Sequence, residues 1–278
     1  MEEERSYVGW IAGGAIVVAV AAFIGYNLWQ KRAAEGPATA PPAEAPATAP
    51  APATATTPPI QHPLPTTETE TEPLPPLAQS DALLTDALTR LLGKKSLGEY
   101  MHVDGIVRRI VATIDNLPRA RVSSKIMIAK PVPGQFLVDR QGDDTVLAPS
   151  NAERYSRYVQ LMDSIDSKRA VAVYLRLYPL FQRAYEELGY PNAYFNDRLI
   201  QVIDDLLAAP DVQGPIKLMQ PKVRYEYADP GLESLSAGQK IMLRMGADNA
   251  ARVKAKLREL RGELTSLPKQ QPAATPTY

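Results

Sequence analysis

The sequence contains no cysteine, only two histidines, and equal numbers of acidic and basic residues. Without cysteine the chain forms neither a disulfide bond nor a thiolate metal site, and a cysteine nucleophile is excluded. His62 lies in a proline-rich run, which leaves His102 alone and excludes a histidine-based metal centre. The 31 acidic and 31 basic side chains leave no net charge, whereas proteins that coat nucleic acid are normally strongly basic. We therefore expect no metal, no cofactor and no nucleic-acid partner.

Common catalytic motifs are also missing: there is no G-x-S-x-G nucleophile elbow, no P-loop and no G-x-G-x-x-G fingerprint. Three pairs of acids lie close together in the chain, namely Asp163 with Asp166, Glu186 with Glu187, and Asp204 with Asp205. Two carboxylates suffice for glycoside hydrolysis, so a cell-wall-active hydrolase is one alternative. Adjacent acids on an amphipathic helix usually face solvent, however, and a general base also needs a partner. We expect a protein that is not an enzyme.

The longest apolar run, residues 8–29, has no charged side chain. As a helix its roughly 22 residues extend about 33 Å, enough to cross a hydrocarbon core of about 30 Å. Trp10, Tyr26 and Trp29 place aromatic rings near its two ends, where they suit the headgroup zone. Acidic residues precede the run, whereas a cleaved signal peptide begins with a basic region. We predict a short polar tail at residues 1–7 and an uncleaved transmembrane helix at residues 8–29, in contact with the lipid bilayer.

Arg5 precedes this helix and Lys31 and Arg32 follow it, so the positive-inside rule is nearly balanced and leans weakly toward an inside C-terminus, against the orientation that we expect. We expect the C-terminal part on the outer side of the membrane, since a stiff linker is most useful where something distant must be reached. A membrane-tethered cytoplasmic scaffold is the alternative. Small residues recur on one helix face, at Gly9, Gly13, Ala21 and Gly25. Such a face permits a weak homodimer through the membrane helix, although glycine and alanine are common in all membrane helices.

Residues 30–79 form a linker rich in proline, alanine and threonine. Proline fixes φ and lacks an N–H donor, so neither a helix nor a sheet propagates through the linker. Polyproline II rises about 3.1 Å per residue, so the roughly 47 residues from Ala33 to Gln79 span at most about 150 Å. Acidic residues in the stretch 66–72 repel one another and resist collapse. We predict a disordered spacer.

The composition changes near Ser80, and residues 80–267 have the periodicity of a folded domain. Apolar residues at helical spacing predict helices at residues 80–93, 103–117, 150–165, 168–188, 196–208, 236–245 and 248–263. Ser80 and Gly93 are expected to cap the first of these helices. Ser150 and Glu153 have the spacing of a capping box at the start of the third.

Short runs of β-forming residues lie between these helices. "KIMIA" at residues 125–129 predicts a strand, and "QFLV" and "TVLA" on either side of "DRQGDD" predict a hairpin. In the extended stretch 214–230, alternation places Val223, Tyr225 and Tyr227 on a buried face. We predict a mostly helical α+β domain with a small antiparallel sheet at residues 80–267, followed by a disordered tail at residues 268–278.

Four longer motifs occur in order along the folded part: "DALLTDALTRL", "DGIVRRIVATIDNLPRARV", "LYPLFQRAYEELGYP" and "VRYEYADPGLESLSAGQKIMLRMGADNAARVKAKLREL". With these motifs the chain resembles an uncharacterised family of membrane-anchored proteins of Gram-negative bacteria, domain of unknown function 3014. The resemblance covers nearly all of the folded part. It implies one N-terminal membrane helix, a proline-rich linker and a C-terminal domain, and it assigns no catalytic residue.

Tyrosine is unusually frequent, with 13 tyrosines against 4 phenylalanines. Several recur at the spacing of one helix face between residues 174 and 185. A tyrosine-lined groove with an arginine nearby stacks on sugars or receives a peptide. The candidate binding residues are Tyr174, Tyr178, Arg183, Tyr185, Tyr194 and Tyr225. The alternative is a core stripe whose hydroxyl groups reach the domain surface.

With the resemblance to a Gram-negative family, these patterns predict a single-pass protein of the bacterial inner membrane that displays a non-enzymatic binding domain in the periplasm. Its partner would be an unknown envelope protein or polymer.

Overall fold

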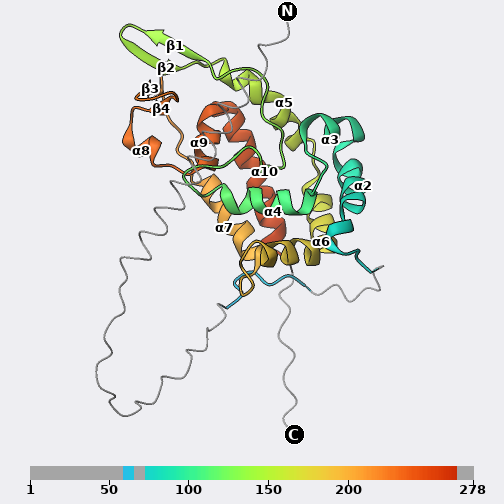
Figure 1. The fold of residues 1–278 in the computed structure, drawn as a ribbon. Helices are drawn as coiled ribbons and strands as arrows, with labels where there is room; N and C mark the ends of the chain where they lie inside the picture. The colour runs from blue at the N-terminus through green and yellow to red at the C-terminus, as the bar shows by residue number, and fades with distance from the viewer. Residues whose placement is uncertain (1–58, 66–72, 268–278) are drawn as a thin grey trace, which may run out of the picture. The chain divides into compact units, whose positions relative to one another are not determined.

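The computed structural model describes residues 59–65 and 73–267, all within one compact unit (Figure 1). The predicted polar tail, the transmembrane helix at residues 8–29, most of the linker and the tail at residues 268–278 lie outside the described residues. Within the described ranges, no helix combines the length and the apolar character that crossing a membrane requires.

The described residues are mostly helical and contain a four-stranded antiparallel sheet in the order β1-β2-β3-β4, which confirms the predicted α+β class. In chain order the elements are η1 (Leu77–Gln79), α2 (Asp81–Leu92), α3 (Lys94–Tyr100), α4 (Ile106–Asn116), β1 (Val138–Gln141), β2 (Asp144–Leu147), α5 (Asn151–Asp163), α6 (Ser167–Glu187), α7 (Phe195–Leu207), β3 (Lys217–Met219), β4 (Glu226–Tyr227), α8 (Pro230–Glu233), α9 (Ala237–Arg244) and α10 (Ala247–Thr265).

The predicted hairpin is present, but its turn is tighter than the sequence pattern suggested. The strands β1 and β2 pair from Val138↔Leu147 to Gln141↔Asp144, so only two residues form the turn between them. Gly142 stands first in this turn with φ 63°, a conformation that glycine adopts without a steric penalty. The hairpin extends away from the helices in Figure 1.

The strand predicted at residues 125–129 is wrong, because only a single bridge between Met101 and Ala129 forms there. Two backbone hydrogen bonds flank the bridge, from His102 N to Ile128 O and from Lys130 N to Tyr100 O. Prolines follow at residues 131 and 133. Since proline lacks the N–H that a ladder needs, the pairing ends after this one bridge.

The buried face predicted for residues 223–227 is also wrong in its first part. Only Tyr227 is buried, whereas Val223 is 90% exposed and Tyr225 is 38% exposed. Strand β4 consists of Glu226–Tyr227 alone, and it pairs with β3 through Leu218↔Tyr227. Residues before 226 therefore have no neighbouring strand that would fix their side chains against the core.

Two predicted N-terminal caps do not form as expected. Ser150 has helical backbone angles, φ −60° and ψ −15°, and its side chain makes no capping hydrogen bond, so the predicted capping box is wrong. The buried Asn151 instead anchors the hairpin by accepting from Leu137 N and donating to Leu137 O. Ser80 precedes α2 as predicted, but its hydroxyl donates to Leu77 O because η1 brings that carbonyl within 2.8 Å.

The helices enclose two hydrophobic clusters, and the sheet covers a third. The first lies among α2, α4, α6 and the start of α7, and it includes Leu74 and Leu77 from the chain that precedes Ser80. The second surrounds α10, which packs against α5, α6, α7 and α9 (Figure 1). The third joins β3 and β4 to Leu243 of α9. Helices α6 and α7 contribute to both of the larger clusters, so their connection is fixed from two sides.

Candidate functional site

The aromatic stripe of α6 packs largely into the core. The ring centroids of Tyr174 and Tyr178 lie 5.7 Å apart, and that of Tyr174 lies 5.5 Å from that of Phe181. Tyr185 is buried, with its ring 5.5 Å from that of Phe195 at the start of α7. Burial raises the pKa of the Tyr178 and Tyr185 hydroxyls, so both stay protonated at neutral pH.

Polar groups on the same helix fix the backbone where α7 begins. The Tyr174 hydroxyl donates to Asn196 Oδ1 at 3.1 Å. Gln182 Oε1 accepts from Tyr178 Oη and from Phe195 N, both at 2.8 Å, and Gln182 Nε2 donates to Ala193 O at 2.9 Å. The stripe is therefore a core element whose polar ends position residues 193–196.

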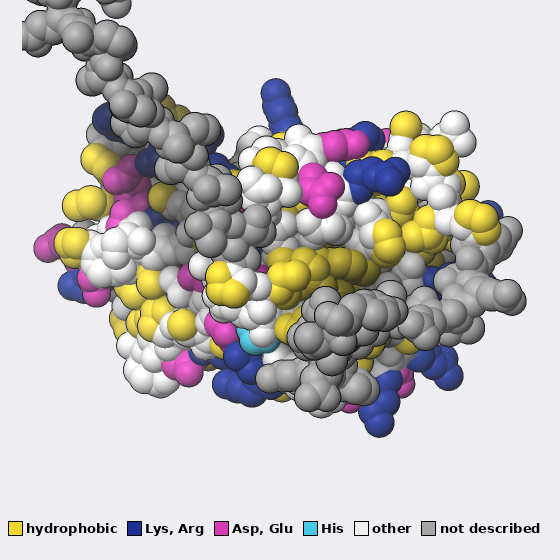
Figure 2. Space-filling model, turned by 90° about the horizontal axis from the view of Figure 1, so that it is seen from below, with side chains coloured by type: hydrophobic (Ala, Val, Ile, Leu, Met, Phe, Trp, Pro, Cys, Tyr) yellow, Lys and Arg dark blue, Asp and Glu magenta, His cyan; other side chains and the backbone are white. Residues whose placement is uncertain are grey.

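A cavity of about 610 Å³ lies beside this junction, and we call it the α7 cavity. Its walls come from α4, α6, the loop between α6 and α7, α7 itself and the segment that precedes the domain. The lining residues are Pro59, Ile60, Gln61, Asp115, Gln182, Tyr185, Tyr190, Pro191, Asn192, Ala193, Tyr194, Asp197, Arg198 and Gln201. Figure 2 shows the domain from below, where apolar side chains gather in the middle of the face and basic side chains protrude around them.

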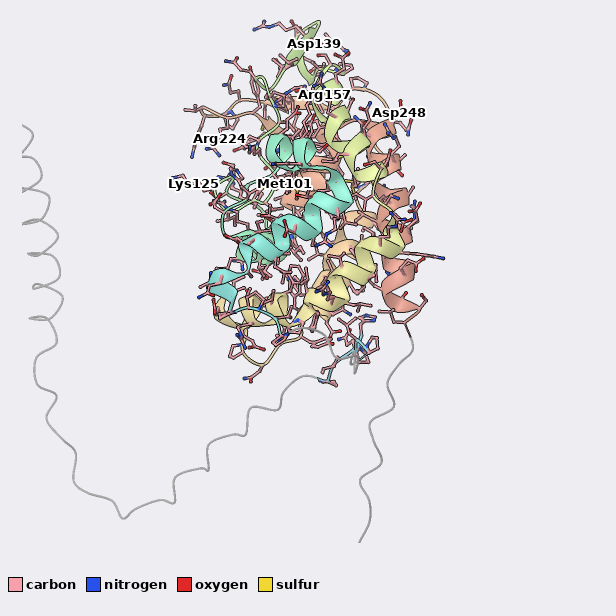
Figure 3. All side chains as sticks on the ribbon, turned by 90° about the vertical axis from the view of Figure 1, so that its right-hand side faces the viewer. Met101, Lys125, Asp139, Arg157, Arg224 and Asp248 are labelled. Atoms are coloured by element: carbon pink, nitrogen blue, oxygen red, sulfur yellow. The ribbon has the colours of Figure 1, made fainter. Side chains whose placement is uncertain are left out.

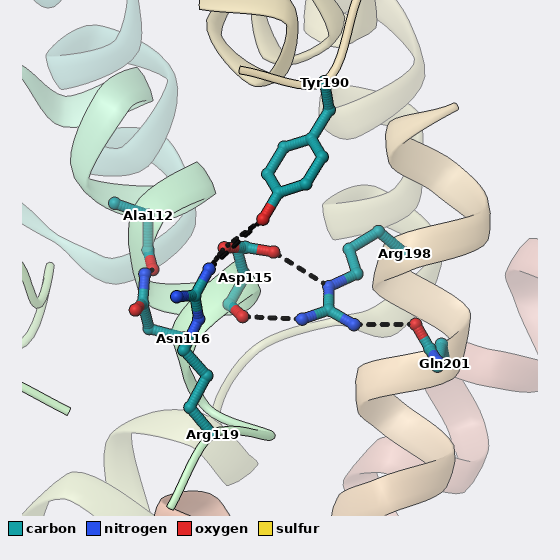
Figure 4. Close-up of polar contacts among 7 residues, drawn as sticks. All are labelled: Ala112, Asp115, Asn116, Arg119, Tyr190, Arg198 and Gln201. Atoms are coloured by element: carbon teal, nitrogen blue, oxygen red, sulfur yellow. Dashed lines mark hydrogen bonds and ion pairs between the residues drawn. The ribbon is translucent and has the colours of Figure 1, made fainter. Parts of the chain in front are cut away.

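One wall of the α7 cavity is a network around Asp115, whose side chain is only 2% exposed (Figure 4). Arg198 donates to Asp115 Oδ1 at 3.1 Å and to Asp115 O at 2.7 Å. Arg119 donates to Asp115 Oδ2 at 2.7 Å, and this hydrogen bond raises the pKa of Arg119. The Tyr190 hydroxyl lies 3.4 Å from the same Oδ2, and the Tyr190 ring stacks on Tyr185 at 4.6 Å. The Asp115 carboxylate thus links α4 to α7 and to Tyr190 in the loop between α6 and α7.

Residues 59–65, which we call the docked segment, contribute Pro59, Ile60 and Gln61 to the lining of the cavity. The main chain of this segment is bound by side chains of the domain: Gln61 N and His62 N donate to the two carboxylate oxygens of Asp197, at 3.0 and 2.7 Å. Leu64 N donates to Tyr194 Oη at 3.1 Å, and His62 O accepts from Asn196 Nδ2 at 2.8 Å. The acceptors and the donor belong to Tyr194, Asn196 and Asp197, at the start of α7.

The structure brings together four of the six residues that the sequence singled out. Tyr174, Tyr178, Tyr185 and Tyr194 meet around the junction of α6 and α7. Arg183 is exposed on α6 and does not line the α7 cavity. Tyr225 lies on a separate cavity of about 500 Å³, where its ring centroid is 6.0 Å from that of Phe136. Figure 3 shows its neighbour Arg224 on that part of the molecule.

The three acid pairs do not converge on the α7 cavity, since none of their members lines it. Each of the six carboxylates makes a structural contact: Asp163 pairs with Arg252, Asp166 caps α6, Glu186 accepts from Gln182, Glu187 pairs with Arg108, Asp204 pairs with Arg261, and Asp205 accepts from Ser236. In the part of the chain that the structure describes, no group of three histidine or acidic residues is arranged to hold a metal ion.

Sequence reasoning missed Asp115, Asp197 and Arg198, although the sequence carries a hint of two of them. Asp115 continues the four-residue steps of the buried Val107 and Val111, so it falls on the apolar face of α4. Arg198 follows the buried Phe195 by one helical turn. A charged residue on an otherwise apolar helix face indicates a buried ion pair. Asp197 carries no such indication, because acids are common in the first turn of any helix.

Comparison with known proteins gives one match. A family model described as "Protein of unknown function (DUF3014)" matches residues 106–261. No curated protein and no solved structure matches the chain. The matched range holds the Asp115 network and the start of α7, whereas the docked segment precedes it.

Proposed function

The chain belongs to the DUF3014 family of proteins of unknown function, and we propose that its domain is a non-enzymatic binding domain whose ligand site is the α7 cavity. In this proposal residues 8–29 anchor the chain in a bacterial inner membrane, and the domain meets an envelope protein or polymer in the periplasm.

The observation that carries the proposal is the docked segment itself. Side chains of Tyr194, Asn196 and Asp197 hold four main-chain groups of a stretch that bends at residues 61 and 62 and belongs to no helix or strand of the domain. Main-chain recognition by fixed side chains is how peptide-binding grooves obtain affinity. The start of α7 therefore has the chemistry of a binding surface.

The adjoining cavity supplies the groups that a ligand site needs. Ligand sites are concave and combine apolar walls with a few oriented polar groups. Here the stacked Tyr185 and Tyr190 provide the apolar wall, and the Asp115–Arg198 pair provides the polar one. Because these polar groups are already held in place, a ligand would not have to order them on binding.

Photocross-linking in cells tests this assignment. A benzophenone amino acid at Asn192 or Gln201, both on the wall of the α7 cavity, is expected to give a discrete product larger than the chain after irradiation. The matched control is the same amino acid at Arg258, an exposed residue of α10. Equal products from all three positions, or products from Arg258 alone, would show that the α7 cavity is not the binding site.

A further inference from the structure

The positions of proline in the docked segment fit the hydrogen bonds that the segment makes with the domain. Of its seven residues, three are proline, at positions 59, 63 and 65. The N–H groups that the domain binds belong to residues 61, 62 and 64. Proline therefore occurs only where no N–H is used, and it is absent wherever a side chain of the domain accepts a hydrogen bond. Proline also restricts φ, which reduces the conformational entropy that the segment loses on binding.

Contacts within the domain hold the receiving groups in place. Asn196 is fully buried, and its Oδ1 accepts from Tyr174, which leaves its Nδ2 directed at His62 O. Tyr194 packs its ring 5.4 Å from that of Tyr178. Asp197 lies in the first turn of α7, where the helix dipole stabilises its charge. Its two oxygens accept from the consecutive N–H groups of Gln61 and His62, which the bend of the chain at these two residues turns toward one carboxylate.

We propose that Tyr194, Asn196 and Asp197 form a site for a bent, proline-interrupted peptide of a partner protein, and that residues 59–65 occupy this site in cis. This inference rests on the proposed function, because it names the class of ligand for the same cavity. Pro59, Ile60 and Gln61 also line the α7 cavity, so a partner peptide that displaces them changes the cavity wall at the same time.

The cis segment has the advantage of proximity over a partner peptide. Only residues 66–72 separate it from the domain, and a chain of that length reaches at most about 25 Å. Short tethers give effective concentrations in the millimolar range. A partner peptide must therefore compete with the docked segment. It occupies the site only where it is abundant or where its affinity for the site exceeds that of residues 59–65.

The test measures binding of a fluorescent peptide that covers residues 57–66, by anisotropy, to the full-length chain in detergent. In one variant Gln61→Pro, His62→Pro and Leu64→Pro together remove the three N–H donors of the docked segment. This variant is expected to bind the peptide at least about tenfold more tightly than the wild-type chain, because the internal competitor is lost. A peptide with proline at the same three positions is expected to bind neither the wild-type chain nor the triple variant. Comparing the two peptides tests the N–H donors without any change in the protein.

Two further substitutions, each added to the triple variant, locate the site. Asp197→Asn removes the charge that accepts two hydrogen bonds and is expected to weaken binding about tenfold to a hundredfold. Asp248→Asn is the matched control, because Asp248 is also an acid in the first turn of a helix, α10, and lies away from the docked segment (Figure 3). It should leave the affinity unchanged.

Equal peptide affinity of the wild-type chain and the triple variant would overturn the proposal, as would equal losses from Asp197→Asn and Asp248→Asn. The cross-linking and peptide-binding results together distinguish failure of the proposed function from failure of the peptide site. Cross-links at Asn192 without peptide binding would leave the α7 cavity as a binding site for a ligand of another class. Peptide binding without cross-links would support the peptide site and refute a cellular partner in the cavity.

Discussion

Replacing Asp115 by alanine is expected to lower the free energy of unfolding by about 3 kcal/mol or more, because it leaves the partly buried Arg198 without its counter-ion. The substitution also removes the acceptor shared by Arg119 and Tyr190. Urea unfolding followed by circular dichroism measures the change. A loss of this size is a large fraction of the 5–15 kcal/mol that stabilises a typical domain.

A double-mutant cycle separates the buried pair from general damage to the fold. Asp115→Ala and Arg198→Ala together should cost clearly less than the sum of the two single changes, with a coupling of about 1–3 kcal/mol. Asp204→Asn is the matched control, because Asp204 pairs with Arg261 where both side chains are well exposed, and its cost should stay below about 1 kcal/mol. Additive losses from Asp115→Ala and Arg198→Ala would show that the pair does not hold α4 to α7.

Replacing Phe195 by alanine is expected to destabilise the domain by about 3–5 kcal/mol, the range for a fully buried aromatic ring. Phe195 is 0% exposed, and its ring lies between those of Phe181 and Tyr185 at centroid distances of 6.0 and 5.5 Å. It is also the first residue of α7, so the cavity left by the truncation adjoins the residues that hold the docked segment. Thermal melting of the variant measures the loss.

Phe195→Leu is the control for this truncation, since leucine refills part of the volume and keeps the site apolar. It should recover more than half of the stability that alanine loses. Similar melting temperatures for Phe195→Ala and the wild-type chain would mean that the start of α7 is not fixed by the aromatic cluster.

The helical periodicity of α6 predicted which tyrosines share a face, because that depends only on residues near one another in the chain. Tyr174, Tyr178 and Tyr185 do lie together, as their spacing requires. Whether this face is a groove or a core stripe depends on what packs against it, and Phe195 belongs to another helix. Tyr225 shows the converse: its alternation pattern predicted burial, but the chain around it lacks the neighbouring strand that would bury it.

Local sequence patterns could not predict the ion pair at the cavity, for a different reason. Asp115 and Arg198 are 83 residues apart, and a carboxylate enters a core only when its partner is present there. The contact of the docked segment with α7 also joins residues that are far apart in the chain. Local composition therefore predicted only an unstructured linker through residue 79. The segment is rich in proline, but main-chain hydrogen bonds to Asp197 and Tyr194 bind it without requiring a helix or a strand.

Amide hydrogen exchange at residues 61, 62 and 64 tests most directly whether the docked segment occupies the site at the start of α7. The account predicts that all three amides of the wild-type chain exchange more slowly than in an unstructured peptide of the same sequence. Asp197→Asn should accelerate exchange at residues 61 and 62 by about tenfold or more, as expected when hydrogen bonds to a charged group are lost. Exchange of all three amides at the rates of the free peptide in the wild-type chain would contradict the account.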